Sequence, residues 1–110
     1  MIYRRKLRYL LVESSSPLDL GSRNAEDALA RELAKFMGEL EYFRANARVA
    51  AQLSDKFFIL SLNRGYEHSL TLALTFIKRL DDRQTGFRTI RTSGTIRSLK
   101  EAYEKLAHSG

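Results

Sequence analysis

The sequence contains no cysteine and no tryptophan, one proline among 110 residues, and two histidines. Without cysteine the chain can form no disulfide, no thiolate zinc site and no thiol nucleophile. His68 and His108 fall in different predicted helices and form no ligand pair, so we predict no metal site.

Long apolar runs are also missing, because stretches such as residues 57–60 fall far short of the ~20 residues of a membrane-spanning helix. No apolar leader follows the basic start of the chain, and we expect a cytoplasmic protein with no membrane contact.

The arrangements that carry side-chain catalysis are missing as well. Residues 14–16 are serines, but they precede Pro17 without a G-x-S-x-G elbow. No glycine-rich phosphate loop of either common type is present. Asp81 and Asp82 are adjacent acids with no third carboxylate near them in sequence. We therefore predict no catalytic residue in this chain and no cofactor bound by the protein itself.

What the chain has is positive charge, with a formal net charge of +6. The excess is concentrated in two clusters, and no acid occurs between residues 83 and 100. Clustered cations predict a footprint for a polyanion, while a solvated basic rim is the simpler alternative. The clusters are Arg4, Arg5, Lys6 and Arg8 near the start, and Arg83, Arg88, Arg91, Arg97 and Lys100 near the end.

The first half of the chain predicts a strand, a helix and a hairpin. Residues 6–14 carry apolar side chains at odd and at even positions, so both faces of the strand are apolar, which is typical of a central strand. Residues 25–37 carry a helical apolar stripe, with Ser22 among the candidate N-caps. Residues 44–53 alternate between apolar and polar, which predicts a strand with one wet face, and residues 57–63 return as its hairpin partner.

The second half predicts two more helices and one more strand. A helical stripe covers residues 66–80, and residues 81–86 read as a loop. Residues 87–92 predict a fourth strand, and Ser98 with Glu101 predicts a capping box for a short terminal helix.

The resulting order is β-α-β-β-α-β followed by a third helix. It predicts one α+β domain over residues 1–110: a ferredoxin-like, or RRM-like, two-layer sandwich with a four-stranded antiparallel sheet and a C-terminal helix. Because the first strand is apolar on both faces, the second face of the sheet needs a cover. The terminal helix can supply all of it, or a partner protein can supply the rest. Base stacking of the RRM kind is disfavoured, since no RRM signature surrounds Tyr9, Phe57 and Phe58.

A small, hydroxyl-rich turn joins the last predicted strand to the terminal helix. Ser93 and Thr95 supply hydroxyls, and we expect Gly94 to take a backbone geometry that a Cβ would resist. The N–H groups that open a helix suit anions, and Arg97 and Lys100 add positive charge beside them. Such a turn is suited to backbone phosphates rather than to base identity.

This turn also carries a family resemblance. The run S-G-T-I-R at residues 93–97 resembles the signature of the ribonuclease P protein component 2 family, the archaeal relatives of the eukaryotic Pop-five subunit. Residues 8–10, R-Y-L, match the opening pattern of that family, and Asn63-Arg64 followed by the helix with residues 70–74 resembles its central segment. The resemblance extends from residue 8 to about residue 106.

The resemblance implies a non-catalytic subunit of ribonuclease P, the enzyme that removes 5′ leaders from precursor tRNA. It implies that the RNA carries the chemistry, with Mg²⁺ on the RNA, and that this protein binds and activates that RNA. The implied partners are ribonuclease P RNA, precursor tRNA and the TIM-barrel subunit (component 3), associated as two pairs in a heterotetramer. Family members often carry a basic residue where this chain has Ser61, so that contact is absent here or supplied by Arg64.

The sequence thus predicts a set of RNA-binding residues and leaves two other function classes open. The predicted set is Arg88, Arg91, Arg97, Lys100, Arg64, Arg4, Arg5, Lys6 and Arg8, with Ser93, Gly94 and Thr95 as a phosphate turn. The first alternative is a homodimeric ferredoxin-like module that binds a ligand and not RNA. The second is a stand-alone nuclease.

Overall fold

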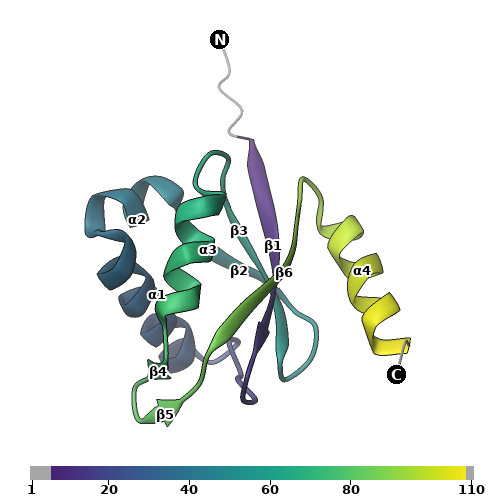
Figure 1. Ribbon diagram of the computed structural model, residues 1–110, viewed down its shortest axis with the longest axis horizontal. Coiled ribbons are helices and arrows are strands. Elements are labelled where there is room, and N and C mark those ends of the chain that lie inside the picture. Colours follow the sequence, from purple (N-terminus) through teal and green to yellow (C-terminus); the bar gives the residue numbers. More distant parts are fainter. Residues whose placement is uncertain (1–5, 109–110) are drawn as a thin grey trace.

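The computed structural model describes residues 6–108, which form a two-layer sandwich with one further helix on its outer side (Figure 1). The elements are β1 Leu7–Ser14, α1 Arg23–Met37, α2 Glu39–Ala45, β2 Arg48–Gln52, β3 Phe57–Asn63, α3 Glu67–Phe76, β4 Arg79–Leu80, β5 Arg83–Gln84, β6 Phe87–Ser93 and α4 Ile96–His108. The main sheet is antiparallel, with strand order β2-β3-β1-β6. The predicted ferredoxin-like topology is therefore confirmed. Arg4 and Arg5 lie outside the described residues.

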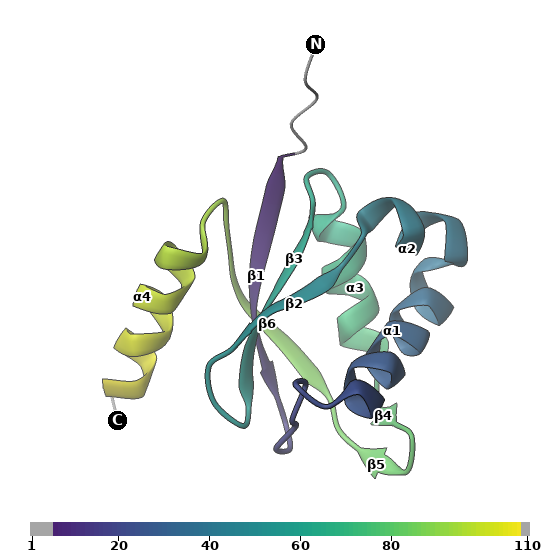
Figure 2. The same cartoon turned by 180° about the vertical axis from the view of Figure 1, so that it is seen from behind.

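Helices α1 and α3 cover one face of the sheet, which we call the inner face, and together they enclose the main core (Figures 1 and 2). Alternate residues of the two central strands point into this core, among them Leu10 of β1 and Leu60 of β3. Helix α1 begins where predicted, because the Ser22 hydroxyl accepts a hydrogen bond from the Ala25 N–H at 3.3 Å. It ends at Gly38, whose φ of 90° is a backbone conformation that glycine adopts without a steric penalty.

Helix α4 lies on the other face of the sheet, the outer face, and builds a second, smaller core. Leu11 of β1, Ile59 of β3 and Leu99 of α4 are fully buried in it. Tyr103 packs its ring against Phe57, with the ring centroids 5.3 Å apart. The apolar outer face that the sequence predicted is real, and the terminal helix covers its centre.

The prediction of one strand over residues 44–53 is wrong in two respects. The chain first forms α2, a short helix that buries Ala45 and ends at Asn46 in a left-handed conformation, so β2 starts only at Arg48. Ala50 is then an extra residue opposite β3, because the pairing moves from Val49 with Leu60 to Ala51 with Ile59. This bulge turns Val49 toward the main core and Ala51 toward the second core, so β2 has no single wet face.

Three predictions in the second half also need correction. Helix α3 ends at Phe76 rather than at residue 80, because the following residues enter a small β4–β5 hairpin in place of the predicted loop. Helix α4 starts before Ser98: the Thr95 hydroxyl accepts a hydrogen bond from the Ser98 N–H at 3.2 Å, so Thr95 is the N-cap and the capping box is wrong. Gly94 has no positive φ, so its predicted special geometry is wrong as well.

Candidate nucleic-acid interface

The antiparallel sheet brings basic residues from distant parts of the sequence to one of its ends. The start of β1, the end of β3, the start of β2 and the end of β6 all lie at this end, as the strand registers require. It is the upper end of the sheet in Figure 1, where β1 begins and β3 ends. We call this surface the basic end, and its cations are Lys6, Arg8, Arg44, Arg48, Arg64 and Arg97.

Contacts between neighbouring elements hold the basic end together. The Arg64 N–H donates to the Lys6 carbonyl at 2.9 Å, which joins the β3–α3 turn to the start of β1. The Asn63 side chain donates to the Arg44 carbonyl at 2.8 Å, which brings the end of α2 to the same place. On the other side, the Arg8 guanidinium lies over the backbone of the residue that follows β6, and a Cβ built there would be 3.7 Å from the Arg8 Nη1 atom. These contacts bring the elements that carry the cations to the same end of the sheet.

The phosphate turn predicted from the sequence lies at the edge of this surface. The Ser93 hydroxyl accepts a hydrogen bond from the Thr95 N–H at 3.2 Å, and the Thr95 hydroxyl caps α4. Each hydroxyl uses an acceptor lone pair in these bonds, so its own O–H can still donate to an anion. Arg97 lies in the first turn of α4, with 91% of its side chain exposed and a 3.4 Å ion pair to Glu101. An exposed pair of this kind is weak and can be exchanged for a phosphate contact.

The other predicted residues are distributed over a wider area. Lys100 is exposed one turn after Arg97 on α4, and Arg91 is exposed in the middle of the edge strand β6. Arg88 lies near the opposite end of β6, where its guanidinium forms a 2.7 Å ion pair with Glu13. That carboxylate offsets the positive charge of Arg88, so Arg88 contributes less to an anion-binding surface than the cations of the basic end.

Two cations of the basic end were not among the predicted residues. Arg44 ends α2 and Arg48 starts β2, and both are exposed. Arg48 pairs in register with Ser61 on β3. A positive charge therefore stands next to the position where the sequence suggested that a basic contact was missing. The sequence could have indicated them, because the predicted hairpin already placed residues 44–53 beside β3.

Arg48 also affects the tyrosine at the centre of α2. The pKa of Tyr42 is raised above its ordinary value of 10.0, mainly because the hydroxyl is partly buried. The positive charge of Arg48 partly opposes this rise, and the negative charge of Glu26 adds to it. Tyr42 is therefore a neutral hydrogen-bonding group at physiological pH.

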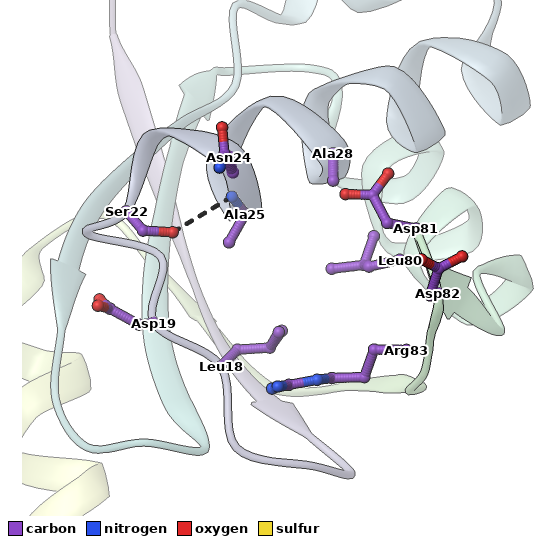
Figure 3. A pocket seen from close by; sticks show the side chains of 10 residues that line it. All are labelled: Leu18, Asp19, Ser22, Asn24, Ala25, Ala28, Leu80, Asp81, Asp82 and Arg83. Carbon is purple, nitrogen blue, oxygen red and sulfur yellow. Dashed lines mark hydrogen bonds between the residues drawn. The ribbon is translucent and has the colours of Figure 1, made fainter.

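A pocket of about 600 Å³ lies away from the basic end, between the start of α1 and the β4–β5 hairpin (Figure 3). Its wall combines Leu18, Ala28 and Leu80 with the carboxylates of Asp19 and Asp82. Within residues 6–108, no three histidine, aspartate or glutamate side chains are placed to hold a metal ion. Over the same residues, no helix is both long enough and apolar enough to cross a bilayer.

Among residues 6–108, five of the seven large apolar side chains that are exposed lie on the helices of the inner layer. Phe36 at the end of α1 stacks on Phe76 at the end of α3, with the ring centroids 6.0 Å apart. Leu72 lies one turn before Phe76, and Leu40 and Phe43 extend the surface over α2, with Phe43 79% exposed. We call these five residues the helical apolar surface. Exposed apolar clusters of this kind are typical of protein interfaces.

Comparisons with known proteins bear on the family and on the fold. The family model described as "Rpp14/Pop5 family" matches residues 8–104. A chain in the cryo-EM structure of yeast ribonuclease MRP is similar in fold, with a TM-score of 0.54 and 11% sequence identity, over 99% of this chain and 97% of that chain. No curated protein matches the sequence significantly.

Proposed function

Because the chain belongs to the Rpp14/Pop5 family of ribonuclease P and MRP protein subunits, we propose that it binds and activates the catalytic RNA of ribonuclease P. In this proposal the RNA, with its Mg²⁺ ions, cleaves the 5′ leader from precursor tRNA. The protein supplies cations that allow negatively charged RNA segments to pack closely. The archaeal and cytoplasmic setting expected from the sequence stays a prediction.

The basic end is the observation that carries this proposal. Its cations come from five separate elements or turns, yet the fold brings them to one end of the sheet. Lys6, Arg44 and Arg64 form no ion pair with any of residues 6–108. Charges held without internal partners can each neutralise a phosphate and release condensed counterions, which favours RNA binding.

The helical apolar surface supports a protein partner in addition to the RNA. Stacked aromatic rings and exposed leucines on three helices suit a packed protein contact better than a phosphate backbone. We propose that this surface receives the TIM-barrel subunit, and that two such pairs associate into a heterotetramer. The protein then contacts RNA at the end of its sheet and protein through its helices.

The proposal is tested by the salt dependence of binding to transcribed ribonuclease P RNA. Replacing Arg64 and Arg97 together by alanine should weaken binding and lower the slope of log K against log salt by about two, since each lost phosphate contact removes about 0.9. The matched control is Lys78→Ala with Arg79→Ala, two exposed cations just before and at the start of β4 that carry the same charge change. It should leave the slope nearly unchanged.

Two results would contradict the proposal. An equal decrease of the slope in both double variants would mean that only net charge matters. No decrease in either variant would mean that the basic end does not bind RNA. Activity is measured separately, by adding the chain and its TIM-barrel partner to the RNA. We expect precursor tRNA processing at lower Mg²⁺ with the natural chain than with the Arg64→Ala/Arg97→Ala variant. A homodimeric ligand-binding module would show neither effect, and a stand-alone nuclease would cleave precursor tRNA without the RNA subunit.

A further inference from the structure

Helix α4 covers only part of the outer face of the sheet. It closes the region near the β2–β3 turn, where Tyr103 packs on Phe57 and Leu99 is buried against Leu11 and Ile59. The helix starts next to the basic end and runs away from it (Figures 1 and 2). The part of the outer face next to the basic end therefore lies beyond the first turn of α4, which does not cover it.

One row of side chains crosses all four strands in this part of the sheet. Arg48 of β2 lies opposite Ser61 of β3, Ser61 lies opposite Tyr9 of β1, and Tyr9 lies opposite Ser93 of β6. Residues directly opposite each other on paired strands share a face. Since Tyr9 packs at the edge of the second core, the row lies on the outer face. We call it the Tyr9 row.

Although the sequence, which lacks an RRM signature, disfavoured base stacking, the Tyr9 row has the chemistry of a stacking platform. Neither the Tyr9 hydroxyl nor the Ser61 hydroxyl has a hydrogen-bond partner within the described part of the chain, and both side chains are half-buried. Leu7, which is 42% exposed, lies on the same face two residues before Tyr9, opposite Asn63. An aromatic ring beside an aliphatic side chain and free hydroxyls can receive the flat face and the polar edge of a base.

We propose that the Tyr9 row binds one unpaired nucleotide of the RNA whose phosphates the basic end holds. This inference rests on the proposed function and adds to it the kind of RNA element, a single-stranded nucleotide with an unstacked base. Arg48 at one end of the row and the turn at Ser93 at the other provide charge and donors for the flanking phosphates. The cations around the row favour a nucleic acid over an apolar protein segment as its occupant.

The test compares two RNA hairpins that carry the same number of phosphates. One has a four-nucleotide single-stranded overhang, and in the other the overhang is abasic. The natural chain should bind the overhang with bases more tightly by about 5-fold to 150-fold, the range typical of stacking one base on an aromatic side chain. Tyr9→Leu should remove this preference, and Tyr9→Phe, which keeps the ring, should retain it. Arg64→Ala/Arg97→Ala should weaken both complexes and leave the preference intact.

A second measurement applies even if Tyr9→Leu does not fold. With 2-aminopurine in the overhang, stacking on the ring should quench its fluorescence in complexes of the natural chain and of Tyr9→Phe. Unchanged fluorescence, or equal affinity for the two hairpins, would overturn the inference while leaving the proposed function intact. Failure of the natural chain to bind either hairpin or ribonuclease P RNA would reject the proposed function instead. If Tyr9→Leu folds, keeps the preference and loses only its TIM-barrel partner, the row is a protein contact and the inference is wrong.

Discussion

The two faces of the sheet are covered very differently. Within residues 6–108, the inner face carries two helices and a core of fifteen buried residues, whereas the outer face carries one helix and a core of three. Burial of apolar area is the main source of folding stability, so the inner face should determine whether the domain folds. The outer face then has surface left for binding, next to the cations of the basic end. Under the proposed function, stability and RNA contact are divided between the two faces.

The largest expected effect is on the inner face. Leu60, 1% exposed, points from β3 into the main core, so Leu60→Ala should lower the free energy of unfolding by about 2–5 kcal/mol. Urea denaturation followed by circular dichroism measures this loss. Leu72→Ala is the matched control, because the same atoms are removed from a side chain that is 49% exposed. Equal losses in both variants would contradict the dominance of the inner face.

A smaller and more local effect is expected on the outer face. Leu99 is the one residue of α4 that is fully buried, so Leu99→Ala should loosen α4 while the sheet stays folded. Native-state hydrogen exchange should show faster exchange in α4 and little change in α1. If the amides of α1 and α4 lose protection together, the two faces form one cooperative unit and the comparison fails.

The smallest expected effect concerns the start of α4. Thr95→Ala removes the N-cap hydroxyl that accepts from the Ser98 N–H, which should cost about 1 kcal/mol. Thr95→Ser keeps an oxygen in the same place and should cost much less. Thermal unfolding of the two variants gives the comparison. A Thr95→Ala variant as stable as the natural chain would show that backbone contacts alone fix the start of α4.

The sequence predicts most of this fold because its strongest signals are local. The apolar stripe of α1, its Ser22 cap and the run from Phe57 to Asn63 are all found where they were predicted. Helix α2 was missed because seven residues are too few to show a helical period, and its last residues fit the alternation of the strand that follows. The extra residues Ala50 and Ile90 could not be foreseen, since a bulge depends on the partner strand.

The candidate site was predictable to a similar extent. An antiparallel strand order already implies that Arg8, Arg64 and Arg97 meet at one end of the sheet. The pairing of Arg88 with Glu13 depends on the register between β1 and β6, which no local pattern reveals. The helical apolar surface depends on how three helices pack, and the sequence pointed instead to the second face of the sheet, to be covered by the terminal helix alone or together with a partner protein.

The extra residues in the two edge strands, Ala50 and Ile90, have a consequence for assembly. An uninterrupted edge strand offers a row of free N–H and C=O groups that can template pairing with another chain. Here the edge strand β2 is interrupted at Ala50 and the edge strand β6 at Ile90, with the exposed side chain of Arg91 beside the second break. Growth of the sheet from copy to copy is thereby discouraged, even where many copies are crowded together. The two bulges therefore lower the risk that copies of the chain pair edge to edge into fibres.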